Sequence, residues 1–140
     1  MIHCIINESC VFSLDHFDSL LQCYDTKGRP LLPVNYDIRK RNTAIENCKE
    51  EAMKFSIILT DRVKALSHDI SENEQLDVHF LGDSKSECFF VTHSTFFREL
   101  AFVSHHGIHH LATVKLMMQF LGCGPDDNIG VANSTLLAKR

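Results

Sequence analysis

Hydrophobic residues recur at helical spacing in three stretches of the chain. They stand three or four residues apart in Ser9–Asp25, in the long stretch Thr43–Ser67, and again in Thr95–Leu121. Such spacing collects apolar side chains on one face of an α-helix. We therefore predict three helices, the first separated from the second by the segment 26–33, "TKGRPLLP". The predicted core-facing residues of the last helix are Phe96, Leu100, Val103, Gly107, Leu111, Val114, Met118 and Leu121.

The hydrophobic pattern changes its period between the second and the third predicted helix. Leu76, Val78 and Phe80 alternate with polar residues, a Gly-Asp-Ser turn follows, and Cys88–Thr92 forms a second extended run. Alternation of this kind is typical of strands with one buried face. We predict a small β-hairpin directly before the last long helix. The 140 residues suffice for a single domain, 1–140, of a mainly α class.

Composition and charge narrow the function classes. Hydrophobic residues make up 44% and charged residues 23% of the chain, and a net charge of −4 provides no basic surface for nucleic acid. No apolar run is long enough to span a membrane, and the start "MIHCIINESC" lacks the features of a secretion signal. The six cysteines form no C-x-x-C pair, which argues against a zinc knuckle or a thioredoxin-like site. We expect a cytoplasmic protein with free thiols and without nucleic-acid or membrane partners.

Four histidines lie close together on the last predicted helix, as His105, His106, His109 and His110. On a helical wheel of about 100° per residue, His106 and His110 border the apolar face, whereas the other pair lies nearly opposite it. Two imidazoles one turn apart beside a helical core can bind one metal ion. We predict the first pair as metal-facing and the second as solvated or in contact with a partner chain. From these residues alone, a metal site and a plain helical surface stay equal alternatives, because zinc needs a third protein ligand.

Several short motifs accompany the histidines. They are "VNYDIRKRNTAIE" at 34–46, "LTDRV" at 59–63, "FFRELAFVSHHGIHHLATVKLMMQFLG" at 96–122 and "IGVANSTL" at 129–136. In combination they resemble the DinB-like (DinB/YfiT-type) superfamily of metal-binding helical bundles, from about Leu14 onward. The resemblance implies an antiparallel helical bundle that holds a divalent ion, zinc or nickel, through three histidines. It places two of these ligands at His106 and His110.

The resemblance is incomplete near the start of the chain. The early helix of the family reads H-x-R-H-x-x-D-H-F, and here "SCVFSLDHF" has Ser9 and Phe12 where the two upstream histidines stand. His16 is left as the candidate for the third metal ligand. Only "MIHCIINE" precedes this helix, so the chain resembles an N-terminally shortened member in which the first long helix is lacking or replaced. We expect the uncovered apolar groove to lower stability and to favour a homodimer.

Three functions stay open at this point. The resemblance implies a metal-dependent enzyme, such as a thiol transferase, in which the ion lowers the pKa of a bound water or thiol and the small-molecule substrate is unknown. Glu99 shares the stripe of the inner histidines and is expected to orient an imidazole. The alternatives are a binding module with a structural metal or none, and a degenerate, metal-free relative that serves as a structural or interaction module.

The basic segment Arg39–Arg41 allows two interpretations. Its side chains can recognise an anion at the start of the following helix, where the helix dipole already favours negative charge. Alternatively they pair with the acidic neighbours Asp37 and Glu46, which is the more common arrangement of such charges.

Overall fold

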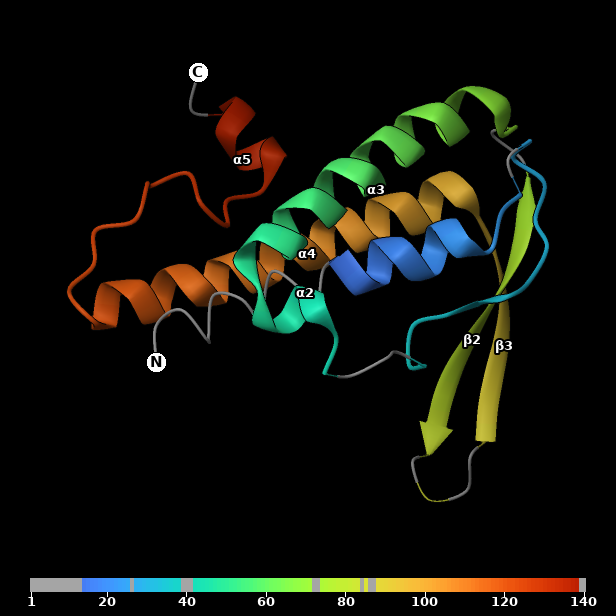
Figure 1. Cartoon of the computed structure of the whole chain (residues 1–140), viewed down its shortest axis with the longest axis horizontal. Coiled ribbons are helices and arrows are strands. Elements are labelled where there is room, and N and C mark those ends of the chain that lie inside the picture. Colours follow the sequence, from blue (N-terminus) through green and yellow to red (C-terminus); the bar gives the residue numbers. More distant parts are fainter. Residues whose placement is uncertain are drawn as a thin grey trace.

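The computed structural model describes residues 14–25, 27–38, 42–71, 74–83, 85 and 88–138. Residues 14–22 are helical, and the later helices are α2 (Ala44–Asn47), α3 (Lys49–Asp69), α4 (Phe96–Phe120) and α5 (Asn133–Ala138). The strands are β1 (Val34–Asn35), β2 (Gln75–Asp83) and β3 (Cys88–Thr95). Figure 1 shows the 14–22 helix and α3 running along the first half of α4, with the β2–β3 hairpin projecting at one end. The structure is mostly helical, as predicted, with a small mixed sheet.

Helix α4 follows its sequence pattern closely. It was expected over Thr95–Leu121 and spans Phe96–Phe120. Thr95 is the N-cap residue, and its side-chain oxygen accepts a hydrogen bond from the backbone N–H of Arg98. The predicted core face is confirmed in the first half of the helix. Leu111 and Leu121 are exposed instead, because the second half of α4 extends past the described 14–22 helix.

The predicted second helix is divided in two. Cys48 has extended backbone angles, φ −133° and ψ 114°, and it ends α2 and begins α3. Asparagine and cysteine have low helix propensity, so Asn47 and Cys48 offer a weak point for such a break. Glu50 and Glu51 then occupy the first turn of α3, where negative charge favours a helix start.

The sheet has the order β1-β2-β3 and contains one strand that the sequence did not predict. The predicted hairpin is confirmed, with β2 antiparallel to β3 and Phe80 opposite Phe90. Strand β1 pairs in parallel with β2 through only two residues, so its hydrophobic pattern is too short to recognise. Gly82 lies at the irregularity near the end of β2, and a Cβ there would come within 2.3 Å of the Phe90 ring. The glycine therefore leaves room for this ring to lie over the strand.

The segment after α4 returns to that helix. Gly130 has φ +68°, and a Cβ at this position would lie 2.3 Å from the backbone nitrogen of Ala112. Only glycine permits such a close approach of two backbones with a left-handed conformation. The short helix α5 follows.

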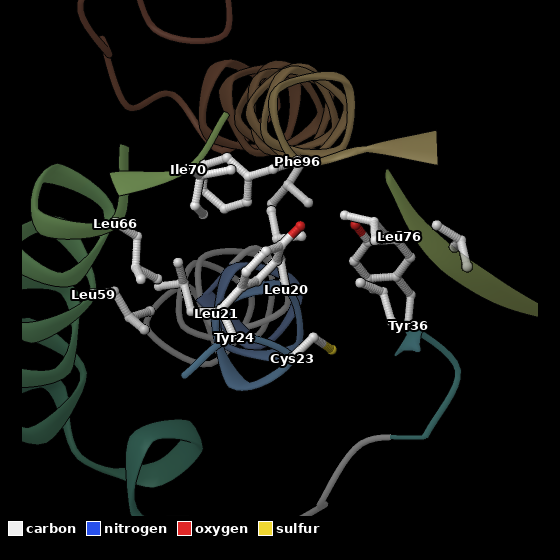
Figure 2. Packing of buried hydrophobic residues seen from close by; sticks show 13 residues of the cluster. Leu20, Leu21, Cys23, Tyr24, Tyr36, Leu59, Leu66, Ile70, Leu76 and Phe96 are labelled. Atoms are coloured by element: carbon white, nitrogen blue, oxygen red, sulfur yellow. The ribbon is translucent and has the colours of Figure 1, made fainter. Parts of the chain in front are cut away.

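The hydrophobic core lies between the 14–22 helix, α3, the first half of α4 and one face of the sheet (Figure 2). Leu20 and Leu21 of the 14–22 helix are completely buried at its centre. Tyr24 meets Phe96 edge to face, with ring centroids 5.1 Å apart. None of the described helices combines the length and the apolar character needed to cross a membrane. The other core residues are Cys23, Val34, Tyr36, Leu59, Leu66, Ile70, Leu76, Val78 and Val103.

Candidate functional site

The four clustered histidines of α4 divide into an inner and an outer pair. His105 and His109 are exposed, whereas His106 and His110 are half-buried, which agrees with the expected division. The Nε2 atoms of His106 and His110 lie 3.0 Å apart, and the two rings meet edge to face. At this distance one ring donates its Nε2–H to the Nε2 lone pair of the other, so the two neutral rings must be complementary tautomers.

The 14–22 helix brings His16 to the same flank of α4. Its ring is buried, with centroid distances of 5.0 Å to His106 and 5.3 Å to Tyr36. The three residues predicted as metal ligands, His16, His106 and His110, thus gather between two helices. We call them the histidine cluster.

The expected divalent-metal function is corrected by the geometry of the described residues. Among them, no group of three or more histidine, cysteine, aspartate or glutamate side chains could hold a metal ion. The rings of the cluster contact one another and their aromatic neighbours instead: the His106 and His110 nitrogens face each other, and His106 stacks on Phe102. The assignment of these residues to an ion stays a prediction of the sequence alone.

The inner histidines are held in their neutral form. Burial lowers the pKa of both His106 and His110 below the ordinary value of 6.5. The neighbouring imidazoles lower it further, with His110 acting first on His106, and His109 first on His110. Because a protonated ring would be both desolvated and close to other rings, the pair is neutral at physiological pH.

Glu99 lies on the same flank of α4 and is completely buried. Its Oε2 accepts a hydrogen bond of 2.8 Å from the Tyr36 hydroxyl. Its Oε1 accepts one of 2.6 Å from the Ser94 hydroxyl and one of 2.5 Å from the Arg98 guanidinium. The expectation that Glu99 orients an imidazole is therefore wrong. The carboxylate fixes Tyr36, and the Tyr36 ring in turn contacts His16.

Sequence analysis did not identify Tyr36 as part of this site. Burial, together with the adjacent negative charge of Glu99, raises the pKa of Tyr36, so its hydroxyl stays protonated and acts as a donor. The sequence feature that could have pointed to Tyr36 was the "NYD" triplet at 35–37. Its neighbour Asp37 accepts a hydrogen bond of 2.6 Å from the backbone N–H of Leu81. The basic residues with which Asp37 was expected to pair, Arg39–Arg41, lie outside the described residues.

The opposite flank of α4 borders an apolar cavity of about 420 Å³. The cavity lies between the 14–22 helix, α3 and α4, and we call it the apolar cavity. Its walls are Leu14, Phe17, Leu59, Val63 and Leu100, with Ser56, Thr60, Lys64 and Ser104 as the polar members of the lining. A second hollow, of about 570 Å³, is lined by polar residues of the 14–22 helix and by mostly apolar residues from the region of α2 and from α3.

The hydroxyl groups of the apolar cavity share one hydrogen-bonding pattern. Thr60 donates to the carbonyl of Ser56, and Ser104 donates to the carbonyl of Leu100, each at 2.8 Å. Ser56 likewise donates to the carbonyl of Met53. Each hydroxyl donates its proton to a backbone carbonyl of its own helix. Its oxygen can therefore act towards a ligand only as a hydrogen-bond acceptor.

Comparison with known proteins gives one informative similarity. No family model matches the chain, and no solved structure matches it. A curated protein described as FK506-binding protein 5, from Rhizopus delemar, is 34% identical over 107 residues. The matched region is 74% of this chain and 26% of that protein, so the chain spans about a quarter of its relative.

This finding overturns the resemblance to the DinB-like superfamily. The match is to a protein of a different description, and no family model supports the resemblance. The expectations that came with it, a metal-dependent thiol transferase or a degenerate, metal-free relative, are corrected together with it. The physical reason is that the longest motif, at 96–122, coincides with α4, and the motif at 59–63 lies within α3. Both motifs largely reflect the apolar spacing of an amphipathic helix, which unrelated helices share.

Proposed function

We propose that this chain is a binding module whose apolar cavity takes a small apolar molecule carrying a hydrogen-bond donor. The observation that carries the proposal is the cavity itself, about 420 Å³ and walled by aliphatic and aromatic side chains of three helices. Small-molecule sites have volumes of roughly 300 to 1,000 Å³, with apolar walls and a few polar groups that fix orientation. The apolar cavity has these features.

The polar groups of the lining specify the kind of ligand. The oxygens of Thr60 and Ser104 act as acceptors because their protons are donated to backbone carbonyls. A ligand with a hydroxyl or an N–H group can therefore form a hydrogen bond there, while its apolar part is buried against Phe17 and Leu100. A ligand with only ether or carbonyl oxygens would find no matching donor on these two hydroxyls.

The similarity to the Rhizopus protein supports ligand binding as the kind of function. That protein is named for binding FK506, and the name applies to a chain of which the match covers 26%. FK506 is therefore a probe for the proposal and not an assigned ligand. The proposal predicts that any binding of FK506 by this chain depends on the residues of the apolar cavity.

The direct test is to fill the apolar cavity. Val63 of α3 is half-buried in its wall, and Val63→Phe would occupy the space that a ligand needs. The probes are 1-octanol, its methyl ether and FK506, and their binding is measured by NMR titration of the backbone amides. We expect 1-octanol to shift the amides of Leu100 and Ser104, and to bind roughly 3- to 10-fold more tightly than the ether, as one hydrogen bond allows.

The matched control lies on the same helix. Ile57 of α3 is 61% exposed and does not line the apolar cavity, so Ile57→Phe adds a similar aromatic group away from the site. Binding should be lost in Val63→Phe and retained in Ile57→Phe. Binding that survives Val63→Phe unchanged, or amide shifts remote from Leu100 and Ser104, would overturn the proposal.

We infer a cytoplasmic setting as part of the proposal. Cys23, Cys48 and Cys123 are free thiols, as is usual in a reducing compartment. Burial raises the pKa of Cys23 to about 11, and its Sγ donates to the carbonyl of Ser19. This thiol is therefore protonated and unreactive. Subcellular fractionation with thiol labelling tests the setting, and oxidised cysteines in the native protein would contradict it.

A further inference from the structure

Strand β3 is the outermost strand of the described sheet and is poorly protected against pairing. Its residues, "CFFVTHST" at 88–95, include no lysine, proline or carboxylate. Phe90 is 62% and Val91 is 55% exposed, and these neighbours lie on opposite faces of the strand. Natural edge strands are usually blunted by charges, prolines or bulges, because their free N–H and C=O groups invite another strand.

The other edge of the same hairpin is covered. Strand β1 pairs with β2 at Val34 and Val78. Beyond that pairing, the Asp37 carboxylate accepts the backbone N–H of Leu81 at 2.6 Å, which removes a free donor from the edge of β2. The described structure therefore protects β2 with a strand and a carboxylate, whereas β2 is the only sheet neighbour described for β3.

We propose that β3 pairs, antiparallel, with β3 of a second copy of this chain, around a two-fold axis at Val91. Two antiparallel strands are related by a two-fold rotation, so one edge is complementary to an identical edge. In this register Phe90 lies opposite the partner's Thr92, and Phe89 lies opposite the partner's His93. No two like charges meet, because His93 already pairs with Asp77 at 2.7 Å on the inner side of the strand.

A second copy fits this edge better than continued strand addition. Two-fold pairing uses both β3 edges and leaves no new one, whereas head-to-tail addition of copies continues into an open assembly. The position of the hairpin also permits the approach of a second copy. Figure 1 shows the β2–β3 hairpin extending away from the helices, so a copy pairing at β3 does not have to displace α3 or α4. This proposal is independent of the apolar cavity.

The first test changes the charge at the edge. In Val91→Lys, two ammonium groups would face each other across the axis. We therefore expect the full-length chain to change from dimer to monomer, with a rise of at least tenfold in the dissociation constant of the dimer. Light scattering after size-exclusion chromatography measures the change. Leu81→Lys is the matched control, since Leu81 lies on β2 in register with Phe89, one strand away from the edge. It should leave the dimer intact. Circular dichroism checks the fold of both variants.

The second test fixes the register. Residues opposite each other in an antiparallel pair have Cα atoms about 4.5 to 5.5 Å apart, within the range for a disulfide. Val91→Cys should therefore crosslink to itself under mild oxidation, with the 91–91 bond identified by peptide mass spectrometry, and Leu81→Cys should not. A monomeric wild-type chain, a dimer that Leu81→Lys dissociates as readily as Val91→Lys, or failure of Val91→Cys to crosslink would each overturn the proposal.

Discussion

The two flanks of α4 differ in how their side chains are hydrogen-bonded and packed. On one flank, the buried Glu99 carboxylate accepts hydrogen bonds from Tyr36, Ser94 and Arg98, and the histidine cluster packs beside it. On the other flank, apolar side chains leave a cavity of about 420 Å³. A helix can thus be fixed firmly by polar contacts on one side while it keeps unfilled volume on the other. Substitutions on the two flanks should therefore change the free energy of unfolding in opposite directions.

The largest effect is expected from removing the carboxylate on the polar flank. Glu99→Ala leaves the Tyr36 and Ser94 hydroxyls without their acceptor, and each buried polar group left unpaired costs about 1 to 3 kcal/mol. We expect the free energy of unfolding to fall by about 3 kcal/mol in urea titrations. The control is Glu51→Ala, which removes an exposed pair with Lys54 and one negative charge from the first turn of α3, and it should cost about 1 kcal/mol or less. An equal loss of unfolding free energy in the two variants would mean that the Glu99 contacts contribute little to the stability of the fold.

An intermediate effect of opposite sign is expected on the apolar flank. Val63→Phe adds apolar area in unfilled space, so we expect the free energy of unfolding to rise by about 1 kcal/mol, the usual gain from filling a cavity. Thermal unfolding followed by circular dichroism measures the change, with exposed Ile57→Phe as the reference. A clear loss of stability in Val63→Phe would show that this flank is already tightly packed.

The smallest effect concerns pH and the inner histidines. Their folded-state pKa values lie below 6.5, so unfolding becomes easier as the pH falls: the unfolded chain binds protons that the folded chain does not. The stabilisation is fully present above pH 6.5 and is lost as the pH drops through the lower folded-state values. The double variant His106→Gln/His110→Gln should therefore show a weaker decline between about pH 7 and pH 5.

His105 provides the control for this pH dependence. It is exposed and does not contribute to the lowered pKa of His106 or His110, so the variant His105→Gln should follow the wild-type decline in urea titrations at each pH. If His105→Gln weakened the decline as much as the double variant of the inner pair, the distinction between the inner and the outer histidines would fail.

Elements with long periodic patterns were predictable from the sequence, and those made by tertiary contacts were not. Helix α4 and the hairpin follow directly from periods of 3.6 and 2. The two-residue strand β1 and the break at Cys48 are too short to alter any pattern. The hydrogen bond between Tyr36 and Glu99 joins residues 63 positions apart, and no local pattern records such a pairing.

The candidate site was predicted only in part, because a local pattern records the geometry of one helix but not the contacts between elements. The wheel of α4 correctly separated His106 and His110 from their exposed neighbours, because one helix determines that geometry. The apolar cavity could not be foreseen, since it depends on how α3 and the 14–22 helix approach Leu100. The family resemblance was wrong because its longest motif, at 96–122, has a spacing that an amphipathic helix alone can explain.

The burial of both tyrosines has a practical consequence for spectroscopy. The chain contains two tyrosines and no tryptophan, so its near-ultraviolet signal comes mainly from Tyr24 in the core and Tyr36 beside Glu99. Burial raises the pKa of both phenols, so phenolate absorbance in alkaline solution should develop together with loss of the fold. In Tyr24→Phe, Tyr36 would be the single remaining tyrosine, and its signal would report on the surroundings of Glu99 without any attached label.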